Sequence, residues 1–239
     1  MHSDTPHILR EFDQAFAALR NEVIAMAGQA RLNLERAMQG LLSRDLVKCK
    51  AAIADDDDVD EAELRIDRIG METLVRFHPV ASDLRLVITS MKVAANLERV
   101  SDHATNIAKR ARKMLARTEC PEVTFLEPLY ALADQQLRDS LSAYTDRNAE
   151  LGQSLQLRDK DLDKMHKRLI ASFTSRLEEG GERAEDYLHL VFVARSLERI
   201  GDLAKNIGED AVYLDQARDI RHDRHDKQGR AVSDEVPAE

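Results

Sequence analysis

Two stripes of polar residues, one hundred positions apart, are the part of this chain best suited to chemistry. Each has Glu, Asp and Asn at intervals of four, at Glu98, Asp102 and Asn106 and again at Glu198, Asp202 and Asn206. Residues spaced by four lie on one face of an α-helix, so each stripe aligns two carboxylates with an amide. Oxygen donors in such a row suit a hard metal ion.

Both stripes belong to a repeated motif. Residues 97–107 read Leu-Glu-Arg-Val-Ser-Asp-His-Ala-Thr-Asn-Ile, and residues 197–207 read Leu-Glu-Arg-Ile-Gly-Asp-Leu-Ala-Lys-Asn-Ile. Seven of the eleven residues are identical. A match this dense at a fixed offset indicates a duplicated unit, and the duplication has kept a polar stripe as well as an apolar one.

A second set of acids precedes the motif in each half. These residues are Asp56, Asp60 and Glu63 in the first half, and Asp159, Asp163 and His166 in a weaker copy in the second. In both halves they interrupt an otherwise apolar helical stripe. Helices joined by a short turn are antiparallel, so these acids can face the motif on the next helix.

Carboxylates gathered on packed helix faces repel one another, and burial adds a desolvation cost that a bound cation offsets. The sequence therefore predicts one metal site of Asp56, Asp60, Glu98 and Asp102, and another of Asp159, Asp163, Glu198 and Asp202. Glu63, Asn106, His166 and Asn206 are candidate additional ligands. This donor set favours iron, Mn²⁺ or Mg²⁺, with zinc as a further candidate.

An acidic pair at helical spacing is also typical of a solvated surface. Arg99 or Arg199 would then pair locally with the neighbouring acids, at little gain in stability. Four pairs in duplicated positions, each on an apolar seam, favour metal over this alternative.

The spacing of apolar residues predicts six long helices and no strands. They cover approximately residues 5–42, 45–77, 79–115, 123–147, 149–178 and 183–214. The fold class is therefore all-α, with two pseudo-symmetric three-helix bundles in residues 1–117 and 122–214. The remainder, 215–239, is polar and charged and is predicted to be a mobile tail.

Composition limits the function classes. The chain has 35 Lys and Arg against 44 Asp and Glu, a net charge of −9, without a basic run, which argues against a nucleic-acid partner. Two lone cysteines, no secretory signal and no apolar run of bilayer length favour a cytoplasmic protein.

At these motifs the chain resembles the PhoU family. The resemblance rests on the paired motifs at 97–107 and 197–207, on Asp-x-x-Val/Leu-Asp at 56–60 and 159–163, and on Pro-Val-Ala-Ser-Asp-Leu-Arg at 79–85. It implies two three-helix bundles whose acidic motifs bind metal clusters, often in a homodimer. One departure is His166, which stands where the first half has Glu63, so the second site is expected to bind metal differently or less tightly.

The resemblance further implies a cytoplasmic negative regulator of phosphate uptake and of the phosphate-starvation response. Its partners would be the ATPase of the Pst phosphate ABC transporter (PstB-like) and a PhoR-like sensor kinase. The sequence contains no phosphate-binding glycine loop and no nucleophile motif with an evident base, so an enzyme is not expected. Two alternatives remain: a di-metal carboxylate bundle with catalytic activity, although Glu-x-x-His occurs nowhere, and a metal-free structural adaptor.

Overall fold

The computed structural model describes residues 5–221, with side-chain surroundings from Arg10 onward, and this part of the chain is helical and contains no strand. Its elements are α1 (Thr5–Leu42), α2 (Leu46–Ala54), α3 (Asp56–Phe77), α4 (Ala81–Leu115), the 3₁₀ helix η1 (Pro121–Leu126), α5 (Glu127–Thr145), α6 (Ala149–Glu178) and α7 (Ala184–Gln216). Across the described residues, none of these helices is both long and apolar enough to cross a membrane.

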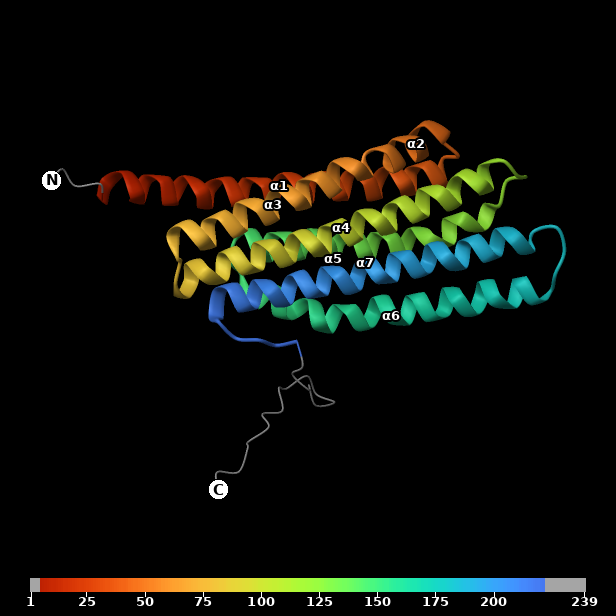
Figure 1. The fold of residues 1–239 in the computed structure, drawn as a ribbon. Coiled ribbons are helices and arrows are strands. Elements are labelled where there is room, and N and C mark those ends of the chain that lie inside the picture. The colour runs from red at the N-terminus through yellow and green to blue at the C-terminus, as the bar shows by residue number, and fades with distance from the viewer. Residues whose placement is uncertain (1–4, 222–239) are drawn as a thin grey trace, which may run out of the picture.

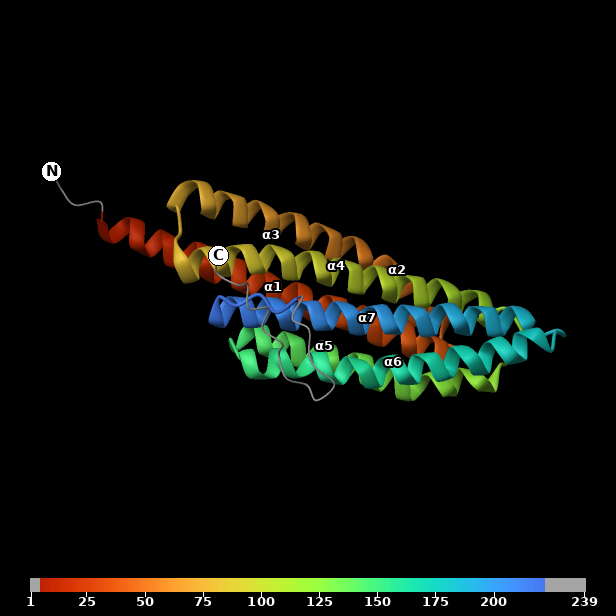
Figure 2. The ribbon, with the colours of Figure 1, turned by 90° about the horizontal axis from the view of Figure 1, so that it is seen from below.

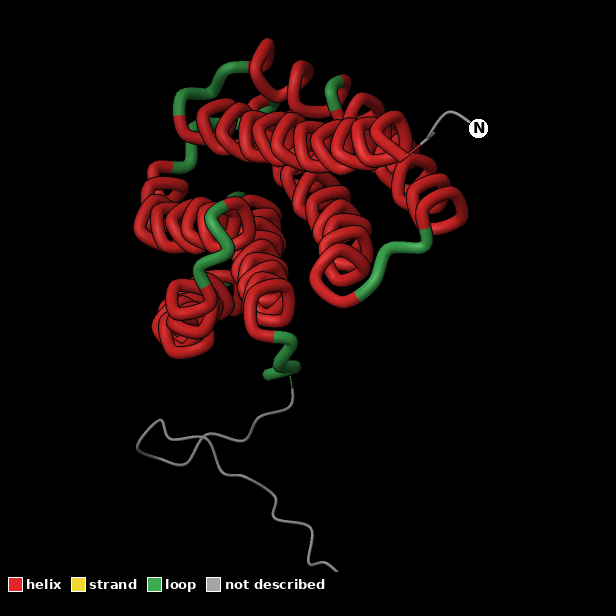
Figure 3. The backbone as a smooth tube through the Cα atoms, turned by 90° about the vertical axis from the view of Figure 1, so that its left-hand side faces the viewer, coloured by secondary structure: helices red, strands yellow, loops and turns green. Residues whose placement is uncertain are grey.

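The helices form two bundles joined side by side. In one, α1, α3 and α4 pack together with the short α2 beside α1 and α4; in the other, α5, α6 and α7 pack together. The two bundles meet chiefly along α4 and α7, which lie next to each other in both ribbon views (Figures 1 and 2). Seen from one end, the helices run roughly along a common direction (Figure 3). The predicted all-α fold of two three-helix bundles is confirmed.

The repeated motif supplies the centre of both bundles. Its apolar residues, with the valine four positions before each copy, are fully buried at equivalent positions, namely Val93, Leu97, Val100, Ala104 and Ile107 on α4 and Val193, Leu197, Ile200, Ala204 and Ile207 on α7. They recur every three or four residues, which is the spacing of one helix face. A single hydrophobic core extends through both halves. The polar residues of the motif are thereby held at fixed positions beside this core.

The prediction of one continuous helix over 45–77 is wrong, because the helix breaks at Asp55 into α2 and α3. A helix break frees backbone carbonyls, which need new partners. Thr105 of α4 donates its hydroxyl to the carbonyl of Ala52 at 3.2 Å, and the buried Asn33 of α1 donates its amide to the carbonyl of Asp55 at 3.3 Å. Side chains from neighbouring helices therefore stabilise the break.

The helix predicted from about residue 123 also begins differently. Residues 121–126 form η1, and the α-helix begins at Glu127, with Pro128 in its first turn. Proline has no backbone N–H to donate to the preceding turn, so it suits the start of a helix and separates the two elements.

Helices α6 and α7 approach closely through two glycines. A Cβ atom on Gly152 would lie 2.5 Å from the carbonyl oxygen of Gly208, and one on Gly208 would lie 2.5 Å from a methyl group of Leu155. No side chain fits between backbones at that separation. Glycine at both positions thus sets the distance between the helices that carry the acids of the second half.

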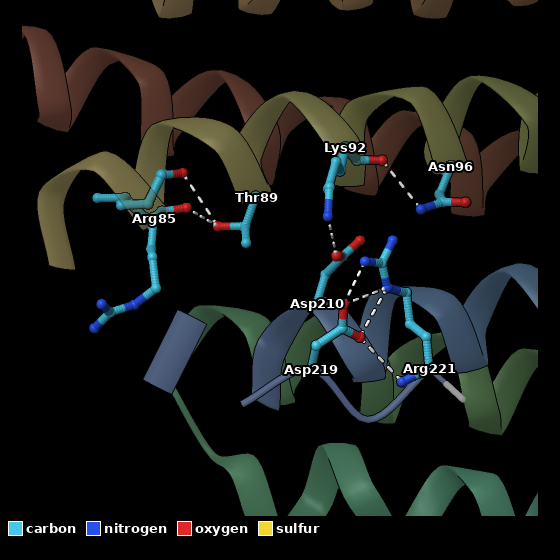
Figure 4. Close-up of polar contacts among 8 residues, drawn as sticks. Arg85, Thr89, Lys92, Asn96, Asp210, Asp219 and Arg221 are labelled. Atoms are coloured by element: carbon cyan, nitrogen blue, oxygen red, sulfur yellow. Dashed lines mark hydrogen bonds and ion pairs between the residues drawn. The ribbon is translucent and has the colours of Figure 1, made fainter. Parts of the chain in front are cut away.

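After α7, the described chain turns back against the second bundle. Ile220 is buried, and its carbonyl accepts a hydrogen bond from the Gln156 side chain at 3.1 Å. Asp219 and Arg221 form an ion pair close to the pair of Lys92 and Asp210 (Figure 4). These residues belong to the expected tail, 215–239, whose part from 222 onward lies outside the described residues.

Candidate functional site

The acids expected in the first half come together where α3 and α4 pack. We call Asp56, Asp60, Glu63, Glu98 and Asp102 the first carboxylate cluster. Burial raises the pKa of Glu98 from 4.5 to about 7, and repulsion from the other four carboxylates adds to this. The pKa of Asp60 and that of Glu63 are also raised, first by burial and then by neighbouring acids. The structure therefore places the predicted residues within electrostatic reach of one another.

No cation within the described part of the chain forms an ion pair with this first cluster. Among the described residues, its one side-chain hydrogen bond comes from Ser101, whose hydroxyl donates to Asp56 Oδ1 at 2.7 Å and accepts from the Asn33 amide at 3.0 Å. This short relay orients Asp56 in the first turn of α3 without adding charge. The cluster thus keeps its repulsion, and an external cation would relieve it.

In the second half, Asp159, Asp163 and His166 of α6 gather with Glu198 and Asp202 of α7, and we call these five residues the second cluster. Burial raises the pKa of Glu198, and Asp202, Asp163 and Asp159 raise it further, whereas Arg199 opposes them. Burial lowers the pKa of His166, so its imidazole is neutral at pH 7. The second set of predicted residues is therefore also brought together.

Unlike the first cluster, the second has a cation of its own. The ammonium group of Lys205 lies 2.6 Å from Asp159 Oδ2 and 3.2 Å from Asp202 Oδ1. Arg199 pairs with the other oxygen of Asp202 at 3.1 Å. Asp159 raises the pKa of Lys205 enough to outweigh the opposing effect of burial, so the lysine stays charged.

The repeat shows how this difference arises. The hundred-residue offset places Thr105 in the first half where the second has Lys205, and Ser101 where the second has Gly201. In the first half both residues donate uncharged hydrogen bonds, to the Ala52 carbonyl and to Asp56. These two differences within one motif thus distinguish a cluster without a cation from a cluster that contains its own cation. Sequence analysis missed the role of Lys205, although the mismatch is visible when the two motifs are aligned.

Three buried atoms of the second cluster have no hydrogen-bond partner in the described chain: Asp159 Oδ1, Glu198 Oε2 and His166 Nε2. Glu198 Oε2 still lies 3.4 Å from the Arg199 guanidinium as an ion pair. Polar atoms without a hydrogen bond away from water are costly, so Asp159 Oδ1 and His166 Nε2 would gain most from a ligand. Two oxygens and an imidazole nitrogen form a mixed set of donors, which differs from the oxygen-only first cluster. The two halves therefore offer different chemistry to a metal ion.

The two asparagines differ in solvent exposure. Asn106 is exposed and lines a cavity between α4 and α7, whereas Asn206 is half-buried on α7. Their role as ligands stays a prediction. Within residues 5–221, no three Asp, Glu, His or Cys side chains stand in the arrangement of a finished metal site. The donor chemistry fits a metal ion, and side-chain rotation at partly exposed positions would have to complete its coordination.

Comparisons with known proteins agree with this architecture. The family model described as "PhoU domain" matches residues 23–111 and 126–211. A PhoU homolog of the phosphate-specific transport system from Pseudomonas putida is 32% identical over 221 residues, covering 91% of this chain and 86% of its own. The PhoU accessory protein of Escherichia coli K12 is 30% identical over 216 residues, which is 90% of each chain.

A solved structure gives the same result. The crystal structure of PhoU from Pseudomonas aeruginosa superposes with a TM-score of 0.84 at 28% identity, covering 87% of this chain and all of the other. The family model therefore spans most of both bundles, and curated relatives match nearly the whole chain at 30% identity or more. This protein belongs to the PhoU family.

Proposed function

We propose that this protein is a non-enzymatic negative regulator of phosphate uptake and of the phosphate-starvation response. It would act by docking on the ATPase of a Pst phosphate ABC transporter and on a PhoR-like sensor kinase. The observation that carries the proposal is family membership over nearly the full chain, since the matched relatives bear the name of phosphate-specific transport system accessory proteins.

The regulatory role is tested in a strain from which every gene for a PhoU-domain protein has been deleted. Transcription of phosphate-starvation genes should stay on in high phosphate and return to repression when this chain is supplied. Co-purification of the supplied protein with the transporter ATPase and the kinase tests the docking. Normal repression in the deleted strain contradicts the proposal.

Metal binding is the second part of the proposal, and the first carboxylate cluster is its main site. A divalent cation there would offset the repulsion that raises the pKa of Glu98. Oxygen-only donors favour Mn²⁺, Mg²⁺ or iron. In the second cluster Lys205 already forms ion pairs with Asp159 and Asp202, so a metal ion would have to compete with an internal cation and would bind more weakly.

In this role a bound ion supplies charge rather than catalysis. It would hold α3 against α4 at the point where five carboxylates otherwise push them apart. The ion therefore couples metal availability to the rigidity of the first bundle. Metal-dependent turnover that is lost in Glu98→Gln would favour an enzyme instead.

We further propose a homodimer whose interface includes the outer face of α3. Leu64, Met71 and Val75 lie on one side of this helix and expose 63%, 54% and 70% of their surface. A second copy would cover this apolar stripe. Sedimentation equilibrium should give a dimer for the native protein and a monomer for Leu64→Glu, with Val47→Glu on α2 as control. A native monomer contradicts this part.

A further inference from the structure

A cationic groove runs between α4 and α7 on the seam of the two bundles. One cavity of about 450 Å³ lies there, and a second of the same volume adjoins it along α4 and shares Asn106 and Arg110 with it. Their other lining residues are Lys109, Arg112 and Lys113 in one, and Arg99, His103, Phe192, Arg195, Ser196 and Arg199 in the other. Cavities of this size hold small molecules, and acidic residues are absent from the described lining.

Internal pseudo-symmetry provides a comparison for this groove. The hundred-residue offset converts Lys92 into Phe192 and Asp210 into Arg110. At one end of the seam, Lys92 pairs with the buried Asp210 at 3.3 Å (Figure 4). At the equivalent place on the other end, the Arg110 guanidinium lies 4.1 Å from the centre of the Phe192 ring. Lys92 is thus paired with a carboxylate at one end of the seam, whereas Arg110 contacts an aromatic ring at the other.

Most cations of the groove are free to bind an anion. Within residues 5–221, the side chains of Arg99, Arg195, Lys109, Arg112 and Lys113 form no ion pair or hydrogen bond, whereas Arg199 is paired with Asp202. Like charges held together repel, and a multivalent anion relieves the repulsion.

Three further side chains of the lining can donate hydrogen bonds to an anion. They are the imidazole of His103, the amide of Asn106 and the hydroxyl of Ser196, and they lie in the same cavity as the guanidinium groups.

We propose that the groove between α4 and α7 binds a small phosphate-bearing anion, with Arg110 and Arg195 as its main contacts. Guanidinium groups match the oxygens of a phosphoryl group in a bidentate arrangement, and several neighbouring cations favour a multiply charged ligand over a simple carboxylate. The exposed Phe192 provides a flat surface beside the phosphoryl position, on which a nucleobase could stack.

Isothermal titration calorimetry of the full chain tests this inference. Metal is first removed on a chelating resin, because a soluble chelator is itself an anion that would compete. Pyrophosphate and ATP are then titrated separately in 150 mM salt, which screens non-specific attraction. We expect saturable binding to one site, weakened about tenfold or more by Arg110→Gln and by Arg195→Gln.

Arg65→Gln is the matched control, because Arg65 is an exposed arginine on α3, away from the groove, paired with Glu22 at 3.3 Å. It should leave binding unchanged. Phe192→Leu separates the two ligand sources: weaker binding of ATP alone indicates a nucleotide, and equal binding of both probes indicates the phosphoryl group alone. Circular dichroism confirms that the variants fold. Absence of saturable binding by either probe at millimolar concentration, or equal weakening by Arg65→Gln, overturns the proposal.

Discussion

Replacing Lys205 with threonine should convert the second cluster into a copy of the first. The ammonium group that lies 2.6 Å from Asp159 and 3.2 Å from Asp202 would be lost, and the residue found at the equivalent position of the first half, Thr105, would take its place. Asp159, which is largely buried, would then have no ion-pair partner among the described residues, because Arg199 pairs with Asp202 and Glu198 instead.

The magnitude follows from these contacts. Removing one partner of a buried ion pair costs about 3–5 kcal/mol. Because 25% of the Lys205 side chain is exposed, we expect a smaller loss in the free energy of unfolding, about 2–3 kcal/mol. For a chain of this length that lowers the melting temperature by about 5–10 °C. A bound ion at a hundred times its Kd would restore about 2.7 kcal/mol.

Urea unfolding of metal-free protein, with and without Mn²⁺, measures both effects. Lys205→Thr should be less stable than the native chain without metal, should regain most of that stability with Mn²⁺, and should bind additional Mn²⁺ in calorimetry. The reciprocal Thr105→Lys should lose Mn²⁺ from the first cluster. A Lys205→Thr variant that is as stable as the native chain, or that gains no Mn²⁺, refutes the idea that lysine stands in for a metal ion.

Three further outcomes test particular contacts. Since the pKa of Glu98 is raised from 4.5 to about 7, the metal-free protein should lose about 1–2 kcal/mol of stability as pH rises from 4.5 through 7, after allowance for solvent screening. Urea unfolding of Glu98→Gln should lack this loss, and parallel pH curves for the two proteins contradict it. Gly152→Ala should cost about 1–3 kcal/mol by forcing the backbones of α6 and α7 apart, whereas Gly28→Ala, with nothing within 4 Å, should be neutral or stabilising; equal melting temperatures refute this. Ser90→Ala removes the 2.6 Å hydrogen bond to the buried Tyr144 hydroxyl and should cost about 1–3 kcal/mol, and Tyr144→Phe in the same background should recover part of that cost.

Helical periodicity was sufficient to predict the bundles and the clusters, for a physical reason. Residues at intervals of three and four must share a face, so an acidic stripe that continues an apolar one can be located without coordinates. The duplication then identified Glu98 and Asp102 with Glu198 and Asp202. These groupings depend only on local geometry and on the packing of neighbouring helices.

The break at Asp55 depends on other helices and could not be seen in local spacing. Local spacing across residues 45–77 is helical throughout, and the break depends on Asn33 and Thr105, which are distant in sequence. The pairing of Lys205 with Asp159 is also tertiary, because its two residues lie on different helices. The cationic groove could not be predicted for the same reason, because Arg110 and Arg195 line the same cavity only when α4 packs on α7.

Calorimetric titration of metal-free protein with Mn²⁺ tests most directly whether the first carboxylate cluster binds a divalent metal ion. The native chain should show one class of tight sites, which Glu98→Gln with Asp102→Asn abolishes and Glu198→Gln with Asp202→Asn leaves in place. Absence of binding by the native chain, or loss of the tight sites only in the second pair of substitutions, would contradict metal binding at that cluster.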